Sequence, residues 1–270
     1  MAQNPVINKF GRVSGGNRPG LPTPSAGDLQ DMYSRPAYAG PTGSGRYMTL
    51  DDVVQRTGAM LAVVLVAGGV SWAVTPDRLA LPVLLTSALV GLALGLYLSF
   101  SMKVNAGSAL VYSAIEGVFL GAISRIFNHA YPGIVIQAIT GTAMVAGGML
   151  FVYKIGAIRV TPKFTRIVVG ATIGVVGLMF VNLAAYLFHP GGLGLRGDAS
   201  GNGTAIAIGF SVLCIVIASM NLVVDFDMIE KGIRNGADEK FAWYASFALM
   251  VTLIWLYIEI LRLLSYFARR

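Results

Sequence analysis

The stretch IVVGATIGVVGLMFVNLAAYLF at residues 167–188 carries no charged side chain, and neither does GTAIAIGFSVLCIVIASMNLVV at residues 203–224. A helix needs roughly 20 mostly apolar residues to cross the hydrocarbon core of a bilayer, and both stretches are long enough. Similar stretches recur between Thr57 and Phe267, about seven in all, and only a few acids interrupt them. The sequence therefore predicts an all-α fold, a polytopic transmembrane bundle of seven helices.

The composition supports a membrane protein and excludes an ordinary soluble domain. The chain is 55% hydrophobic and only 12% charged, whereas soluble domains contain roughly 25% charged residues. The net charge of +7 could indicate nucleic-acid binding, but the basic residues stand at the ends of apolar stretches instead of clustering, as in membrane proteins. We therefore expect the lipid bilayer as a partner and no nucleic acid. The single cysteine, Cys214, lies inside a span, so no disulfide framework is expected within one chain.

The chain divides into two parts. Residues 1–48 are rich in Gly, Pro, Ser and Asn, and such a segment buries too little apolar surface to offset its ordering entropy. We predict a disordered cytoplasmic tail there and a seven-helix transmembrane domain over residues 49–270. Thr49 and Asp52 have the spacing of a capping box and mark the first helix start. We expect no cleavable signal peptide, because the first residues lack a continuous apolar core.

Turn residues and apolar runs give approximate bounds for the spans. The first follows the cap at Thr49 and ends near Val74, and a short turn with Pro76 makes a hairpin with the second. The remaining six are predicted at about residues 79–100, 106–127, 131–153, 164–188, 204–229 and 241–267. Residues 189–203 are predicted to form a flexible outer loop.

The distribution of basic residues predicts the orientation. With the N-terminus inside, 14 of the 20 Lys and Arg lie on the cytoplasmic side and 6 on the other, as the positive-inside rule favours. Seven spans then place the C-terminus outside, which Arg269 and Arg270 oppose. If the last helix stops short or re-enters the bilayer, the C-terminus returns inside, so both arrangements stay open.

Three pairs of glycines four residues apart fall inside predicted spans. They are Gly91 and Gly95, Gly117 and Gly121, and Gly170 and Gly174. Small residues at this spacing allow two helix backbones to approach closely. We expect packing within one chain, with homodimerisation as the alternative.

Glu116 is the deepest acid of the third span. It lies about ten residues into the helix, roughly 15 Å from its start at 1.5 Å per residue. A charged side chain near the bilayer centre costs at least about 2.5–3.5 kcal/mol. Glu116 must therefore face the bundle interior or water, or carry a proton, and it serves either function or structural hydrogen bonding.

Three further acids are candidates. Asp225 and Asp227 follow the sixth apolar run, point to different faces, and could both mark the membrane interface. Asp227 is four residues before Lys231, the spacing of a helical ion pair. Glu259 lies in the seventh span with Arg262 three residues later, which predicts either a structural ion pair or a functional site.

Enzyme chemistry finds little support in the sequence, and we expect neither an enzyme nor a bound cofactor other than a possible calcium ion. His129 and His189 lie near the ends of spans, away from the acids, so a transition-metal site is not predicted. The spans contain no G-x-S-x-G turn and no H-E-x-x-H helix. An intramembrane aspartyl protease would need a second aspartate motif, which is missing.

Short segments of the chain are similar to a known family. VDFDMIE at residues 224–230, YASF at 244–247, LYIEILRLL at 256–264 and IEGVFLG at 115–121 resemble the Bax inhibitor-1 family, most closely its bacterial YccA-type branch. The resemblance covers about residues 49–268. It implies a seven-helix bundle with a central last helix, in the bacterial plasma membrane.

The resemblance also implies a function, a pH-sensitive calcium leak gated by two aspartates that face each other on the sixth and seventh helices. Asp227 matches the first aspartate, and Thr252, which cannot ionise, stands at the position of the second. Either Glu116 or Glu259 substitutes for it, or the protein does not gate calcium by this route. Carboxylate oxygens are the ligands that calcium prefers, so Asp227 and Glu116 are the candidate metal ligands.

Two hypotheses of function follow. In the first, the protein responds to ions or protons and leaks calcium, with Asp227, Asp225, Glu116 and Glu259 as ion-binding or pH-sensing groups. In the alternative, it is a non-transporting interaction protein that binds or modulates a membrane-bound AAA protease through its N-terminal tail, as the resemblance implies. The sequence leaves the oligomeric state open.

Overall fold

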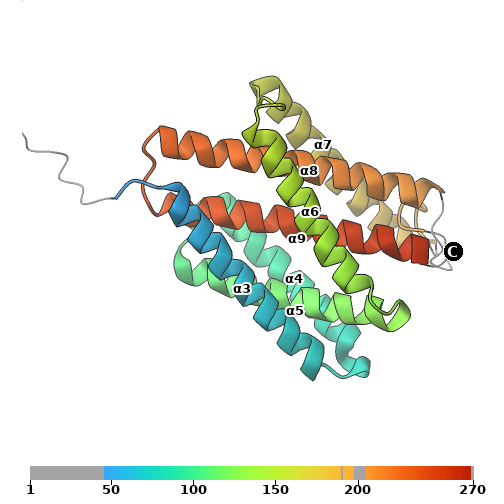
Figure 1. Cartoon of the computed structure of the whole chain (residues 1–270). Helices are drawn as coiled ribbons and strands as arrows, with labels where there is room; N and C mark the ends of the chain where they lie inside the picture. Colours follow the sequence, from blue (N-terminus) through green and yellow to red (C-terminus); the bar gives the residue numbers. More distant parts are fainter. Residues whose placement is uncertain (1–45, 190, 198–204, 269–270) are drawn as a thin grey trace, which may run out of the picture. The chain divides into compact units, whose positions relative to one another are not determined.

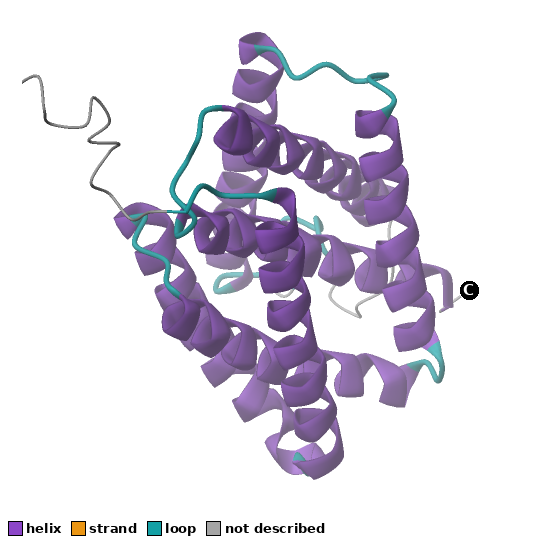
Figure 2. Ribbon diagram, turned by 60° about the vertical axis from the view of Figure 1, so that its left-hand side comes forward, coloured by secondary structure: helices purple, strands orange, loops and turns teal. Residues whose placement is uncertain are grey.

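The computed structural model describes residues 46–189, 191–197 and 205–268. These residues form helices and no strand (Figure 2). The helices are α3 (Leu50–Val74), α4 (Asp77–Ser101), α5 (Ala106–Ala130), α6 (Ile134–Lys154), α7 (Pro162–Tyr186), α8 (Ala205–Arg234) and α9 (Phe241–Ala268) (Figure 1). They match the predicted spans to within a few residues, so the seven-helix fold is confirmed. The predicted tail lies outside the described residues as far as residue 45.

Local sequence signals explain where several helices begin. Thr49 caps α3 in the predicted capping box with Asp52. Asn105 caps α5, and its side-chain oxygen accepts a hydrogen bond from the main-chain nitrogen of Ser108 at 2.9 Å. Thr161 caps α7 in the same way, with Pro162 in the first turn, where a missing N–H costs nothing.

Helix α9 occupies the centre of the bundle, as the family resemblance implies. It packs against α3 and α5 on one side and against α8 and α6 on the other (Figures 1 and 2). Helix α4 packs on α5, and α7 packs on α8, so both lie at the periphery. Successive helices run in opposite directions, which gives the bundle two ends. We call the end with residues 46–49 the tail end, and the end with residues 195–197 the loop end.

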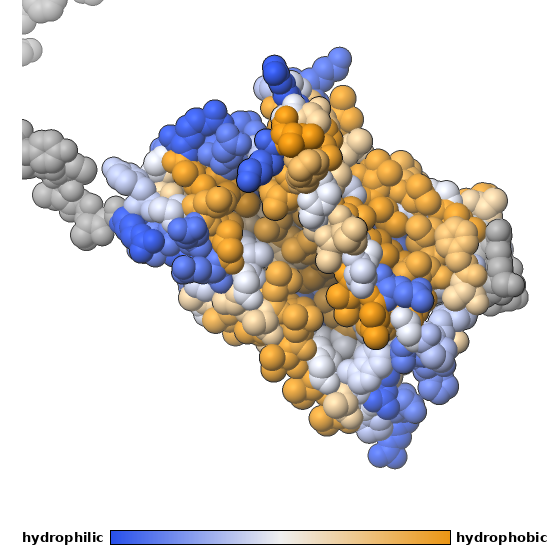
Figure 3. All heavy atoms as spheres, viewed as in Figure 1, coloured by the Kyte–Doolittle hydropathy of each residue, from blue (hydrophilic) through white to orange (hydrophobic). Residues whose placement is uncertain are grey.

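The lateral surface of the bundle is apolar where a soluble protein would be polar. Leu65, Ile136 and Phe180 expose 64%, 72% and 60% of their surface. Figure 3 shows hydrophobic residues over the middle of the helices and hydrophilic residues gathered at their ends. Each of the seven helices is long and apolar enough to cross a membrane. A surface of this kind is stable only in lipid, so the chain is an integral, multi-pass membrane protein.

The glycine pairs differ in what they contact. Gly117 and Gly121 bring α5 against the backbone of α3: a Cβ at Gly117 would lie 2.7 Å from the carbonyl oxygen of Val64. This confirms close packing within the chain at that pair. Gly91 and Gly95 instead face the side chains of Glu116 and Tyr112 on α5. A Cβ at Gly170 or Gly174 would meet no described atom within 4 Å, so packing within the chain does not explain the third pair.

Residues 46–48 are fastened to the turn between α8 and α9. The main-chain nitrogen of Met48 donates to the oxygen of Ala237 at 2.8 Å, and that of Glu239 donates to the oxygen of Arg46 at 2.9 Å. The Met48 side chain is 2% exposed and packs with Val53. These three residues, which the sequence assigned to the tail, are thus part of the folded bundle.

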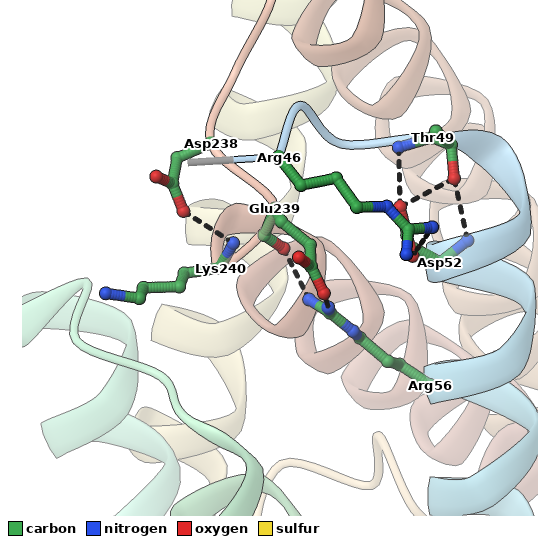
Figure 4. A network of polar contacts seen from close by, with 7 residues as sticks. All are labelled: Arg46, Thr49, Asp52, Arg56, Asp238, Glu239 and Lys240. Carbon is green, nitrogen blue, oxygen red and sulfur yellow. Dashed lines mark hydrogen bonds and ion pairs between the residues drawn. The ribbon is translucent and has the colours of Figure 1, made fainter. Parts of the chain in front are cut away.

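Side chains reinforce this attachment at the tail end (Figure 4). Arg56 of α3 donates to the carboxylate of Glu239 at 2.7 Å and also to its main-chain oxygen. Its guanidinium stacks on the Trp243 ring, 5.1 Å from the centroid. Arg46 pairs with Asp52 at 3.0 Å. These contacts hold the start of α3 against the start of α9, and we assign them a structural role.

Candidate functional site

Glu259 is neutralised by an arginine from the α7–α8 loop. Both of its oxygens accept hydrogen bonds from Arg196 at 2.8 Å, and Arg262 lies 3.7 Å away. The Glu259 side chain is only 1% exposed. The predicted ion pair with Arg262 is therefore present but secondary to a bidentate pair with Arg196, a residue that the sequence placed in a flexible loop. Because of this bidentate pair, we assign Glu259 a mainly structural role.

Asp227 lies seven residues before the end of α8. It forms the predicted ion pair with Lys231, 2.5 Å away and four residues later. The Asp227 side chain is 15% exposed and that of Lys231 is 51% exposed. Asp227 is therefore a largely covered carboxylate whose charge is balanced by a lysine of its own helix.

Asp225 points to a different face of α8, toward α9. Thr252 of α9 donates a hydrogen bond to its Oδ2 at 2.6 Å. Thr252 is buried, and the oxygen of Ala248 in its own helix lies 3.2 Å from the same hydroxyl, which has a single proton to share between the two acceptors. It is thus Asp225, and not the Asp227 of the resemblance, whose carboxylate contacts Thr252 across the two helices.

Glu116 is enclosed between α4 and α5. It is 9% exposed, and its carboxylate lies so close to Gly91 that a Cβ there would approach Oε1 to 2.7 Å. The Tyr112 hydroxyl interacts with the carboxylate from one turn earlier on α5. The Tyr112 ring packs edge-on against Phe247 of α9, with centroids 4.9 Å apart. Glu116 therefore faces the protein, which fits its predicted position inside the bundle.

Glu116 and Asp225 share one feature: among the described residues, no basic side chain balances the charge of either carboxylate. Within residues 46–189, 191–197 and 205–268, neither forms an ion pair with Lys or Arg, whereas Glu259 and Asp227 do. Glu116 lies ten residues from the tail-end terminus of α5 and Asp225 nine from that of α8, about 15 and 14 Å of helix. Both approach α9, through Tyr112 and Thr252. These two uncompensated carboxylates, on different flanks of α9, are the candidate functional groups.

The predicted metal ligands Glu116 and Asp227 lie in separate surroundings. Glu116 lies between α4 and α5, whereas Asp227 pairs with Lys231 on α8. The part of the chain that the structure describes contains no group of three or more His, Cys, Asp or Glu side chains that could hold a metal ion. Calcium takes six to eight oxygen ligands. A resident calcium ion on this pair is therefore not supported by the described geometry.

Two contacts of the site region were not predicted from the sequence. The pairing of Asp225 with Thr252 depends on how α8 is rotated against α9, which the two-residue spacing of the aspartates leaves undetermined. The pairing of Glu259 with Arg196 requires the α7–α8 loop to fold back onto α9. The only signal for it is an arginine in a loop that follows a span, and this signal does not identify a partner.

Together, the helix bundle, its apolar surface and its buried acids define a class, polytopic membrane proteins with ionisable groups in their core. A family model described as Bax inhibitor 1 like matches residues 4–269. The chain belongs to this family. The match begins well before residue 49, so the family relationship extends over the N-terminal segment that the sequence resemblance left out. No curated protein matches the chain.

Proposed function

We propose that the protein conducts cations across the membrane, with calcium as the transported ion, and that protonation of Asp225 controls the pathway between α8 and α9. The observation that carries the proposal is the 2.6 Å hydrogen bond from the buried Thr252 to Asp225, a partly buried carboxylate that has no basic partner among the described residues. Ionisable residues inside a membrane bundle commonly mark ion pathways.

The chemistry of this pair suits a switch. An ionised Asp225 accepts the Thr252 hydroxyl and attracts a cation, whereas a protonated Asp225 offers no charge to a passing ion. Thr252 does not ionise, so a single carboxylate takes up the proton, in contrast to a coupled pair of aspartates. Asp225 and Thr252 supply too few oxygens for a stable calcium site, which favours passage over storage. Glu116, on the other flank of α9, is the second candidate group, and a pH dependence that survives in Asp225→Asn would assign the control to it instead.

Asp225→Asn is expected to reduce calcium flux into liposomes at least tenfold and to remove its dependence on pH. Two unit charges 4 Å apart attract by about 4 kcal/mol at an effective dielectric constant of 20, and each 1.4 kcal/mol is a factor of ten. Asparagine imitates the protonated carboxyl and cannot titrate, so flux should be equal at every pH. The measurement is flux into reconstituted vesicles between pH 5 and 8, with a calcium indicator inside.

Asp227→Asn is the matched control, because it removes the same charge two residues away, where the carboxylate pairs with Lys231. Its flux and pH profile should stay close to those of the wild type. Thr252→Asp adds the second carboxylate and should replace a one-step pH profile by a two-step one. The proposal fails if Asp225→Asn and Asp227→Asn behave alike.

We also propose the orientation and location that the sequence favours, a bacterial plasma membrane of the YccA-type branch with the N-terminus in the cytoplasm. Asn235 at the tail end and Arg78 at the loop end are both exposed, while the native Cys214 is fully buried. A membrane-impermeant maleimide added to intact cells is expected to label Arg78→Cys strongly and Asn235→Cys only after permeabilisation. The reverse pattern would invert the topology.

The alternative, a non-transporting partner of a membrane-bound protease, has one observation in its favour. The family match includes most of the N-terminal segment, and residues 46–48 attach that segment to the α8–α9 turn. A protein bound to the segment would therefore act on a fixed point of the bundle. Absence of calcium flux from the wild-type protein would favour this alternative.

A further inference from the structure

At the loop end of α9, the described residues include two partly buried cations and one buried anion. Arg196 and Arg262 both approach Glu259, and each arginine side chain is 24% exposed. Among the described residues, one carboxylate neutralises one guanidinium, so this part of the cluster keeps one net positive charge. An excess charge in this position is costly unless an anion accompanies it.

Arg262 is the arginine with unused hydrogen-bonding capacity. Arg196 occupies both Glu259 oxygens at 2.8 Å, whereas Arg262 stays 3.7 Å from the nearer one, too far for a hydrogen bond. No other described side chain forms an ion pair with Arg262. A guanidinium has five N–H donors, so Arg262 can still bind an acceptor such as a phosphate.

Two buried hydroxyls next to Arg262 also lack an acceptor. Tyr266 lies one turn beyond it on α9, and the Tyr266 hydroxyl is close to that of Ser211 on α8. Neither oxygen completes a hydrogen bond of good geometry with a described residue. Tyr266 is 5% exposed and Ser211 is fully buried. Buried hydroxyls are normally satisfied. Even if one of the two donates to the other, the second still has a proton to donate, which a polar ligand beside Arg262 would accept.

An apolar groove leads away from the same cluster. A cavity of about 240 Å³ lies between α7 and α9, walled by Val176, Phe180 and Leu183 of α7 and by Trp255 of α9, with Arg196 at its polar end. This volume is below the roughly 300–1,000 Å³ of pockets that hold whole drug-sized ligands. It suits a segment of one acyl chain.

The order of these groups along α9 matches that of an amphiphile. Trp255, Glu259, Arg262 and Tyr266 stand at positions i, i+4, i+7 and i+11, so they share one face of the helix. Along this face, the apolar groove lies deeper in the span and the cations lie nearer its end. A phospholipid in the surrounding bilayer has the same order, with its acyl chain deeper in the membrane and its phosphate nearer the surface.

We infer that this face binds an anionic phospholipid, with its phosphate at Arg262 and the two free hydroxyls and one acyl chain against Trp255 and α7. The single net positive charge of the cluster selects a lipid with a net negative charge over a zwitterionic one. The site is separate from Asp225 and Glu116, so it does not depend on the proposed cation pathway.

The test uses fluorescence quenching of Trp255 in the full-length chain, in non-ionic detergent, with Trp72→Phe and Trp243→Phe as the background. Phosphatidylglycerol with brominated acyl chains should reach half-maximal quenching at a concentration about tenfold lower than brominated phosphatidylcholine. Arg262→Gln should abolish this preference while leaving the pair of Arg196 and Glu259 intact, so the variant should remain folded. Arg262→Lys, which keeps the charge, should retain most of it.

Arg78→Gln is the matched control, because it removes an exposed arginine at the same end of the bundle, and it should leave the preference unchanged. Equal quenching by the two lipids in the wild type would overturn the inference, as would an equal loss in both glutamine variants. Binding of inorganic phosphate without any lipid preference would also overturn it, since the site would then take a soluble anion.

Discussion

Glu259→Gln should destabilise the bundle by about 3–5 kcal/mol, the range expected when one partner of a buried ion pair is removed. The substitution keeps the size of the side chain but leaves Arg196 and Arg262 facing each other without an anion. Glu259 is 1% exposed and accepts two hydrogen bonds at 2.8 Å, so solvent cannot compensate. The measurement is the free energy of unfolding of the purified protein in mixed micelles.

A matched substitution at an exposed pair separates burial from charge. Glu230 pairs with Arg234 at 3.4 Å, with both side chains more than half exposed. It also accepts a hydrogen bond from the Tyr153 hydroxyl, which the amide oxygen of glutamine can still accept. Glu230→Gln should therefore cost no more than about 0.5 kcal/mol. Adding Arg262→Gln to Glu259→Gln removes the second cation and should recover part of the lost stability. Similar costs for the two single substitutions would refute a structural role for the buried pair.

Gly117→Val is expected to disrupt the packing of α3 on α5 and to cost at least about 3 kcal/mol, at the upper end of the range for overpacking. The new Cβ would lie 2.7 Å from the Val64 carbonyl oxygen and 2.8 Å from the Ala67 Cβ. A backbone carbonyl cannot rotate away as a flexible side chain would, so the two helices must separate. Thermal unfolding in detergent should show a large decrease in Tm.

Gly170→Val is the control for this prediction, because it introduces the same side chain at the corresponding position of another glycine pair. A Cβ at Gly170 would meet no atom of the described residues within 4 Å, so the monomer should tolerate the substitution. Loss of stability at both positions would indicate that α7 packs against a surface beyond the described residues of one chain.

The helices could be predicted from the sequence because a membrane span is a property of one continuous segment. Apolar length alone identified all seven, and Thr49 with Asp52 fixed the start of α3 through a local hydrogen-bond pattern. The depth of Glu116 along its helix followed from counting residues, and the cost of a charge in lipid left the bundle interior as one of the predicted alternatives. None of these predictions required knowledge of which helix neighbours which.

The partners of the acids could not be predicted, because they depend on how each helix is rotated about its axis and on how the α7–α8 loop folds back onto α9. Asp225 and Asp227 are two residues apart and lie on different faces, and only the packing of α8 on α9 decides which one meets Thr252. Arg196 reaches Glu259 from 63 residues away in the chain. Family resemblance placed Thr252 correctly against the sixth helix but paired it with the neighbouring aspartate.

Because residues 46–48 are attached to the α8–α9 turn, a mechanical force applied to the chain before them would be transmitted to this turn. A pull on the chain ahead of Arg46 would meet the hydrogen bonds to Ala237 and Glu239 and the buried Met48 before it reached α3. The turn joins the two helices that carry Asp225 and Thr252. A pull on the N-terminal segment would therefore act on the packing of α8 against α9 around Asp225, and the segment would transmit mechanical force to this carboxylate.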